Sequence, residues 1–293
     1  MEIKSPLTHG QATLLEQIPT QTIIDLYKPY SDVSRFFSHV ETVDLYECND
    51  TSYRFYYPYD IDGDGPFYEE LSNEKNYYVP WKAEHEIAHS YIAPNDTVLE
   101  MGCATGDFLV AEVAKNNITP YGTELNQEAK SRATKRGVKF DSVDNADVTC
   151  SFQVLEHIAD VRSFIESAIA STKVGGHIIF GVPNNDSLLK DDGICFLNMP
   201  PHHMGLWDKK SLSSLPQYFA MDLVATHEET LQPNHYRWYY QIYYGDKLRG
   251  LGIFGKIINK AVYTLFAQFF IRRKANTING HTIVAVYKKR NDN

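Results

Sequence analysis

The chain has 293 residues, of which 43% are apolar and 13% aromatic. This composition excludes a disordered or collagen-like chain, and the length suffices for one large domain or for a core with an appendage. Lys and Arg number 28 against 37 Asp and Glu, which gives a formal net charge of −9. The negative charge argues against a nucleic-acid partner and favours a small molecule.

Four cysteines stand far apart, without a CxxC pair, and no secretory apolar region follows the first residues. This pattern is typical of free thiols in the cytosol. No stretch approaches the roughly 18 uncharged apolar residues of a transmembrane helix. We therefore expect a cytoplasmic protein.

Residues 1–80 are unusually rich in aromatic side chains. They predict a helix over 21–38, followed by short strands and turns. The run 62–66, Asp-Gly-Asp-Gly-Pro, marks a turn; it resembles the start of a calcium loop but lacks the remaining ligand positions. We interpret residues 1–80 as an N-terminal cap and residues 81–293 as the core.

Residues 81–185 alternate short β-rich runs with helical stretches, which is typical of a parallel sheet with crossover helices. We expect helices over 81–92, 106–116, 126–136 and 160–171, and strands over 97–101, 118–123, 138–141, 147–152 and 175–182.

Residues 186–220 are too rich in Pro and His for a long regular element and predict a loop with a short helix near 208–215. A strand over 222–230, a helical insertion over 241–273 and a terminal strand over 281–287 follow. Strands on both sides of an insertion indicate an antiparallel pair at the edge of the sheet.

A glycine-containing turn lies where the first core strand ends and the next helix begins. Gly102 and Gly106 allow a tight turn and a close approach of a ligand to the backbone. Glu100 lies on that strand and Glu124 ends the next one, where a carboxylate can accept ribose hydroxyls. Asp107 opens the helix, and this negative charge disfavours phosphate and suits a ligand with an amino group and a sulfonium.

These motifs, together with Ser151–Ile158 and Gly175–Asn184, resemble class I S-adenosylmethionine-dependent methyltransferases over roughly residues 80–230. The resemblance implies a Rossmann-like α/β fold with a mostly parallel seven-stranded sheet, an antiparallel edge strand and helices on both faces. The leader around residues 45–58 resembles a bacterial subgroup associated with cell-surface glycan and secondary-metabolite pathways.

The resemblance implies S-adenosyl-L-methionine as cofactor and S-adenosyl-L-homocysteine as product. The residues expected to bind the cofactor are Glu100, Gly102, Cys103, Ala104, Gly106, Phe108, Glu124, Leu125, Asp144 and Gln153. Two features depart from the family pattern: Ala104 replaces a glycine, and the connection after the third strand is short. Asp141, Asp144 and Asn145 remain alternatives for the contact with the adenine amino group.

Methyl transfer to a hydroxyl requires alignment of donor and acceptor and removal of a proton, for which histidine is the usual base. We expect His202 and His203 to be the first candidates and His157 the next. The alternative is that the two adjacent histidines belong to a structural lid and donate to backbone carbonyls. Tyr68, Tyr77 and Tyr78 either line the site or pack in the core or on the surface.

No metal is expected. The resemblance to ubiquinone-type O-methyltransferases implies Glu, Glu and His as ligands, but Gln153 stands at the first of these positions, and an amide is a poorer ligand for a hard cation. Some relatives hold zinc in the leader with paired cysteines, whereas only Cys48 is present here.

Residues 252–274 repeat apolar side chains at helical spacing between basic flanks, which predicts an amphipathic helix. Three roles stay open for it: peripheral contact with an anionic membrane, docking on the sheet, or a homodimer contact.

We therefore expect an S-adenosylmethionine-dependent methyltransferase that acts on a hydroxyl of a small molecule or saccharide. The alternatives are N- or C-methylation, another use of the sulfonium, and a regulatory or scaffold protein that binds the cofactor without catalysis. The donor motif does not select the acceptor atom, because pocket geometry does.

Overall fold

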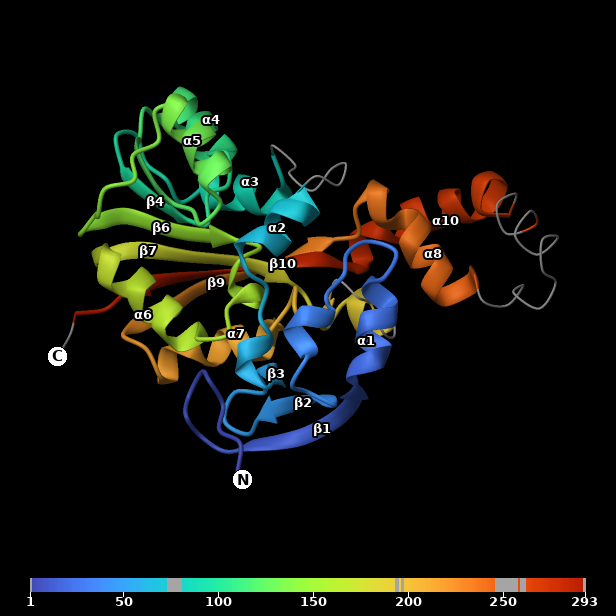
Figure 1. The fold of residues 1–293 in the computed structure, drawn as a ribbon. Helices are drawn as coiled ribbons and strands as arrows, with labels where there is room; N and C mark the ends of the chain where they lie inside the picture. The colour runs from blue at the N-terminus through green and yellow to red at the C-terminus, as the bar shows by residue number, and fades with distance from the viewer. Residues whose placement is uncertain are drawn as a thin grey trace.

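The computed structural model describes residues 2–72, 81–192, 195, 198–245, 258 and 262–291. Two sheets organise the chain, one of six strands and one of four (Figure 1). The larger sheet forms the core, and the smaller one is built mainly from the N-terminal segment.

The six-stranded sheet has the order β5-β4-β6-β7-β10-β9. Strands β5, β4, β6 and β7 are parallel, and β10 is antiparallel to both β7 and β9. The β9–β10 pair closes one edge of the sheet, as the sequence predicts. The bounds are β4 Thr97–Met101, β5 Thr119–Thr123, β6 Ala146–Phe152, β7 Thr172–Pro183, β9 Met221–Thr230 and β10 Asn279–Lys289.

Helices cover both faces of this sheet (Figure 1). On β7, Ile179 packs in one apolar cluster with residues of α3 and α4, and Ile178 packs in the other with residues of α6 and α7. Coverage of both faces explains why successive residues of the central strands are buried, as Val148–Phe152 of β6 are. The helices are α3 Ala83–His89, α4 Asp107–Asn116, α5 Gln127–Lys135, α6 Val161–Ser171 and α7 Lys209–Ser214.

The strand expected over 138–141 is reduced to one parallel bridge, between Tyr121 and Lys139. The segment that follows reaches β6 at Ala146 without a helix. A right-handed parallel crossover normally needs ten or more residues, so this segment is too short to hold a full strand in register. Among the described residues the core sheet therefore has six strands instead of the expected seven.

The four-stranded sheet has the order β1-β2-β3-β8, with all pairs antiparallel. Its strands are β1 Ala12–Pro19, β2 Thr42–Cys48, β3 Arg54–Tyr57 and β8 Gly205–Leu206. The helix expected over 21–38 is split into α1, Thr20–Tyr27, and a 3-10 turn over Ser34–Phe37. Pro29 contributes to the break, since proline has no amide hydrogen to donate to the preceding turn of the helix. Helix α2, Gly65–Ser72, completes this part.

Strand β8 follows β7 of the core in the sequence but belongs to the four-stranded sheet. The residues just before it, 198–204, here called the His loop, therefore lie between the two sheets. Met204 accepts from the Tyr56 amide at 2.9 Å and donates to the Glu156 carbonyl at 2.8 Å. The Tyr27 hydroxyl donates to the Met199 carbonyl at 3.0 Å. The N-terminal segment thus holds the His loop against the core.

The domain boundary near residue 80 stays a prediction, and residues 73–80, with Tyr77 and Tyr78, lie outside the described residues.

Between β9 and β10 the chain forms α8, Tyr236–Tyr244, a π-helical turn, Tyr263–Ala267, and α10, Gln268–Lys274, which project from the sheet edge (Figure 1). Within the amphipathic helix expected over 252–274, residues 252–257 and 259–261 lie outside the described part. Phe269 and Phe270 are exposed, next to the basic residues 272–274. Membrane contact and homodimer formation stay predictions. In the part of the chain that the structure describes, no helix is both long and apolar enough to cross a membrane.

A substitution at Gly205 tests how tightly β8 packs in the four-stranded sheet. A Cβ at Gly205 would overlap the hydroxyl of Tyr53, which is fully buried with its ring 4.2 Å from that of Trp207 and cannot retreat. We expect Gly205→Ala to lower the free energy of unfolding by about 1–3 kcal/mol in urea denaturation. Gly65→Ala is the control, because a Cβ at Gly65 would have no other atom within 4 Å; equal stability of the two variants would contradict this packing.

Candidate functional site

The turn between β4 and α4, here called the glycine loop (Gly102–Gly106), is held in left-handed backbone geometry. Gly102, Ala104 and Gly106 have φ angles of 82°, 47° and 75°. A Cβ at Gly102 would lie 2.5 Å from Val154 Cγ2, and one at Gly106 would lie 2.8 Å from Val138 Cγ2. Glycine is therefore required at both positions for steric as well as conformational reasons. Ala104 tolerates the left-handed geometry that the family pattern gives to glycine.

Glu124, which follows β5, fixes the glycine loop. Its carboxylate accepts from the Ala104 amide at 2.8 Å and from the Asn126 amide at 2.7 Å. Each carboxylate oxygen has a second lone pair, so Glu124 can still accept from a ligand at the carboxyl ends of the strands. Leu125 beside it is 86% exposed and has its side chain available to a ligand.

Glu100 is buried on β4, and its Oε2 has no hydrogen-bond partner among the described residues. Burial raises the pKa of this carboxyl from 4.5 to about 8, and the nearby Asp107 and Glu124 carboxylates add to the increase. An unpartnered buried carboxyl group is costly, which suits a donor or a positive charge supplied by a ligand.

Two of the residues expected to bind the cofactor place their side chains in the core. Cys103 packs on Gly122, where an added Cβ would lie 2.5 Å from its Sγ. Phe108 packs in an aromatic cluster with His85 and Phe152, with ring centroids 5.1 Å from each. These two side chains support the loop from behind.

Sheet register separates the alternatives for the adenine contact. Lys139 bridges to Tyr121, so Asp141 lies level with the carboxyl ends of β5 and β4. Asp144 is exposed two residues before β6 begins, which places it toward the opposite, amino edge of the sheet. The register therefore favours Asp141 over Asp144.

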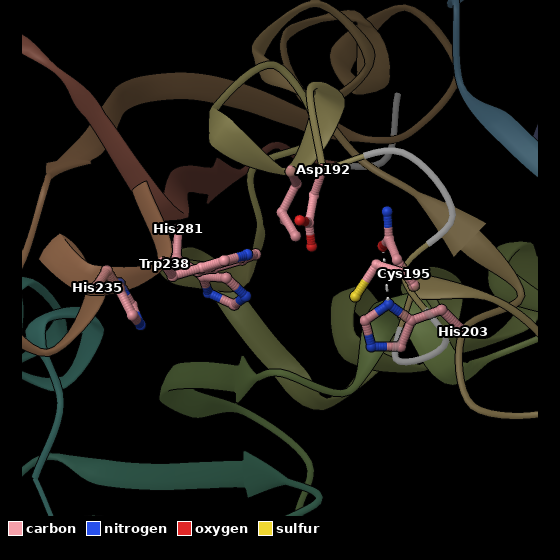
Figure 2. Close-up of a pocket in the computed structure, with 8 residues that line it drawn as sticks. Asp192, Cys195, His203, His235, Trp238 and His281 are labelled. Carbon is pink, nitrogen blue, oxygen red and sulfur yellow. Dashed lines mark hydrogen bonds between the residues drawn. The ribbon is translucent and has the colours of Figure 1, made fainter. Parts of the chain in front are cut away.

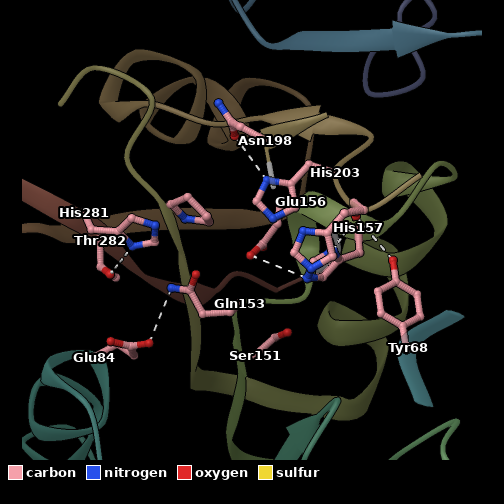
Figure 3. Close-up of polar contacts among 12 residues, drawn as sticks. Tyr68, Glu84, Ser151, Gln153, Glu156, His157, Asn198, His203, His281 and Thr282 are labelled. Atoms are coloured by element: carbon pink, nitrogen blue, oxygen red, sulfur yellow. Dashed lines mark hydrogen bonds and ion pairs between the residues drawn. The ribbon is translucent and has the colours of Figure 1, made fainter. Parts of the chain in front are cut away.

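Gln153 follows β6 and has a φ of 56°, which is uncommon for a residue other than glycine. Its Nε2 donates to Glu84 Oε1 at 3.4 Å, and its amide donates to the Gly181 carbonyl at 2.8 Å (Figure 3). Glu84 is buried on α3, and burial raises the pKa of its carboxyl. This pair closes the space between β6, β7 and α3 at the carboxyl edge of the sheet.

The structure brings the three candidate base residues together in one group, here called the histidine cluster (His157, His202 and His203). The ring centroid of His157 lies 4.6 Å from that of His202 and 4.9 Å from that of His203, and the His202 and His203 rings stack at 4.5 Å. One ring nitrogen from each residue lies within 4.8 Å of the others. The cluster forms because β6 and β7 end at the same edge of the sheet and each leads into a histidine-bearing segment.

Hydrogen bonds orient two of these rings. His157 Nδ1 lies 2.5 Å from the His202 carbonyl oxygen, and His203 Nδ1 lies 3.1 Å from Asn198 Oδ1 (Figure 3). Both acceptors are carbonyl oxygens, so each Nδ1 carries the proton and each Nε2 keeps its lone pair. Burial lowers the pKa of His157 to about 4 and that of His203 well below its usual value, which keeps both imidazoles neutral near pH 7.

Two further residues, Tyr68 and Glu156, lie next to the histidine cluster. The Tyr68 hydroxyl donates to the His202 carbonyl at 3.3 Å, so this tyrosine of the N-terminal segment reaches the site, as one of its two expected roles requires. Glu156 is buried, and its Oε1 lies 3.8 Å from His157 Nε2. Burial raises the pKa of Glu156 to about 8.

A cavity of about 390 Å³ opens beside His203. Figure 2 shows His203 and Cys195 on one side of it and His235, Trp238 and His281 on the other. Burial lowers the pKa of His235, and that of His281 to about 4. The cavity can hold a small molecule within reach of the histidine cluster.

Sequence reasoning missed several of these residues. Glu156 and Asn198 stand next to predicted site residues, but their burial and contacts appear only in the fold. His235, Trp238 and His281 are distant in sequence, and only the β7–β10 register brings His281 to the site, through a bond from the Asn184 amide to its carbonyl at 2.7 Å. No local sequence signal identifies these three residues.

Comparison with known proteins agrees with this arrangement. The sequence matches a family described as a methyltransferase domain over residues 73–241, more than half of the chain. A ubiquinone biosynthesis O-methyltransferase of Vibrio parahaemolyticus is 31% identical over 105 residues, which cover 30% of this chain and 44% of that protein. A probable S-adenosylmethionine-dependent methyltransferase of Mycolicibacterium smegmatis is 27% identical over 124 residues, 38% of this chain and 47% of that protein. The chain thus matches less than half the length of these relatives.

Among solved structures, a SAM-dependent methyltransferase from Archaeoglobus fulgidus superposes with a TM-score of 0.50 and 18% identity, covering 76% of this chain and all of that one. At this identity the likeness concerns the fold.

Glu100 provides a test of the site's electrostatics. Its pKa is about 8 in the folded chain and near 4.5 when exposed, so the folded state binds more protons between these values and loses stability as pH rises through them. We expect Glu100→Gln to remove this loss of stability. The free energy of unfolding of the variant should therefore exceed that of the wild type by an amount that increases from about pH 7 to pH 8. Histidines are mostly neutral in both states over this range. Urea denaturation at both pH values measures it.

Glu128→Gln is the matched control, because the Glu128 side chain is 73% exposed. If wild type and Glu100→Gln change stability in parallel between the two pH values, Glu100 does not titrate as described.

The family match spans the glycine loop, Glu124 and the parallel strands β4 to β7 of the core sheet. The chain therefore belongs to the methyltransferase-domain family.

Proposed function

We propose that this methyltransferase transfers the methyl group of S-adenosylmethionine to a hydroxyl of a small molecule or saccharide. The observation that carries the proposal is the position of the histidine cluster. It lies at the same sheet edge as the glycine loop and borders, through His203, a cavity of small-molecule size. The Nε2 lone pair of a neutral imidazole at that place can accept a hydroxyl proton.

The residues at the glycine loop fit the cofactor. Glu100 offers an unpartnered buried carboxyl oxygen for an amino group, and Glu124 offers remaining lone pairs for ribose hydroxyls. Gly102 and Gly106 give the loop its left-handed turn, and Asp141 is level with the strand ends for the adenine amino group. When bound, S-adenosylmethionine supplies a methyl group on a sulfonium, an electrophilic carbon with a good leaving group.

His203 is the proposed proton acceptor. Asn198 Nδ2 donates to Asn185 Oδ1 at 2.7 Å, which directs Asn198 Oδ1 toward His203 Nδ1. This chain of hydrogen bonds holds the tautomer in which Nε2 can accept a proton. His157 and His202 pack against the ring and limit its rotation.

The cavity supports an uncharged acceptor. Its described lining contains the Trp238 ring, three imidazoles and the Asp192 carboxylate, and no Lys or Arg. An anionic acceptor, such as a nucleotide sugar, would find no counter-charge in these residues. Flat apolar faces with hydrogen-bonding edges suit a sugar or phenol ring. The relatives named as ubiquinone biosynthesis O-methyltransferases also favour oxygen as the acceptor atom.

Methylation of nitrogen or carbon is the nearest alternative, because the donor motif serves all three atoms. A protein that binds the cofactor without catalysis is the other. A base that takes a proton in the reaction distinguishes hydroxyl transfer from both, since an amine acceptor needs no base once it is neutral and a binding protein makes no product.

A methyl-transfer assay with a panel of uncharged sugars and phenols tests the proposal, with S-adenosylhomocysteine formation as the readout. We expect His203→Gln to lower kcat about 10²–10⁴-fold, the usual contribution of a positioned base, without weakening cofactor binding. His39→Gln is the control, because its side chain is 54% exposed and lies on the N-terminal segment.

Product formation from amines but from no hydroxylated acceptor would overturn the choice of oxygen. Unchanged kcat in His203→Gln would remove His203 from the role of base.

A further inference from the structure

The histidine cluster has a geometry that proton transfer alone does not require. One imidazole would suffice as a base, yet three come together from two separate segments, and His202 and His203 are each 7% exposed. One ring nitrogen from each of the three histidines lies within 4.8 Å of the others. Three imidazoles around one point are a common set of protein ligands for a transition metal ion.

In two of the rings Nδ1 already donates a hydrogen bond, as the nitrogen that does not bind the ion usually does in a metal-binding histidine. His157 Nδ1 and His203 Nδ1 donate to carbonyl oxygens, of His202 and Asn198. Such bonds fix the tautomer and leave Nε2 directed at the ion. The Tyr68 hydroxyl, bonded to the same His202 carbonyl, further fixes this acceptor.

Glu156 provides an independent observation. It is 1% exposed, its Oε1 lies 3.8 Å from His157 Nε2, and its Oε2 has no hydrogen-bond partner in the described part of the chain. In Figure 3 its carboxyl group points toward the imidazoles. A carboxyl group without a partner in a dry site is costly, and a nearby cation would compensate that cost.

We propose that His157, His202 and His203, with Glu156 beside them, bind one divalent transition metal ion of the zinc type. Ligand nitrogens lie about 2.0–2.1 Å from zinc and hence about 3.4 Å from each other in a tetrahedral site, so small side-chain rotations would close the observed spacing. Imidazole ligands favour zinc, cobalt or iron over magnesium and calcium, which prefer oxygen.

This proposal replaces the expectation of metal-independent chemistry, which rests on the Gln153 position alone. Gln153 donates to Glu84 and stays outside the cluster. The His loop supplies a different set of ligands. The role of the ion rests on the proposed hydroxyl methylation: as a Lewis acid it would lower the pKa of an acceptor hydroxyl bound to it, so that this hydroxyl loses its proton to solvent while the His203 Nε2 lone pair binds the ion. His203 would be the base only in the metal-free protein.

The test is metal binding by the full chain, independent of turnover. Chelator-treated protein is titrated with Co²⁺ and, separately, with Zn²⁺. We expect one equivalent of Co²⁺ with a visible spectrum of nitrogen and oxygen ligands, displacement by Zn²⁺, and a higher melting temperature with Zn²⁺, because a ligand specific to the native state stabilises it.

Matched variants locate the ion. His157→Gln with His203→Gln should abolish stoichiometric binding and the increase in melting temperature, and Glu156→Gln should weaken it. His235→Gln with His281→Gln, on the opposite wall of the cavity, should retain both. The wild-type measurements need no variant, so misfolding of the cluster variant leaves the proposal testable.

Three results would overturn the proposal: less than stoichiometric binding by folded wild type, a thiolate-to-cobalt charge-transfer band, which would place the ion at a cysteine such as Cys195, or loss of binding in the His235 and His281 variant alone. Methyl transfer is measured on the same samples. Metal binding without transfer would contradict the proposed function, whereas full transfer by chelated, metal-free protein would leave His203 as the base and overturn the role of the ion.

Discussion

The His loop is held on both sides by backbone hydrogen bonds, and the geometry of the histidine cluster depends on this constraint. Met204 bonds to Tyr56 of β3 on one side and to Glu156 of the core on the other, and the Asn185 amide bonds to the Trp207 carbonyl. Because these bonds involve backbone groups, they fix the path of the loop whatever its side chains are. His202 and His203 consequently meet His157, which follows a different strand.

The N-terminal segment contributes to this constraint in addition to packing on the core. Its strand β3 pairs with β8, and its Tyr27, Tyr56 and Tyr68 hydroxyls donate to carbonyls of the His loop. The parallel strands position the cofactor side by themselves, because their carboxyl ends meet at one edge. The acceptor side needs the additional sheet, since a loop rich in proline and histidine has no regular structure of its own to hold it.

Much of the core could be predicted from the sequence, because apolar runs, turn residues and the glycine pattern are local signals. The ranges of β4 and α4 follow from Thr97–Asn116 alone, and Glu124 follows from its place at a strand end. Features that depend on competing or distant residues could not be predicted in this way: Pro29 helps to end α1 sooner than periodicity indicates, and Asp144 falls on the amino edge only because the connection before β6 is short. His281 enters the site through β10 register, which no local pattern encodes.

The central claim is that the glycine loop and Glu124 form the cofactor site, and calorimetric titration with S-adenosylhomocysteine tests it most directly. We expect one site per chain in the wild type and at least tenfold weaker binding in Glu124→Ala, because a charged hydrogen bond contributes about 1.5–3 kcal/mol and 1.4 kcal/mol is a factor of ten. Glu128→Ala, on the exposed face of α5, should bind as the wild type does. No binding by the folded wild type, or equal affinity in Glu124→Ala, would contradict the account.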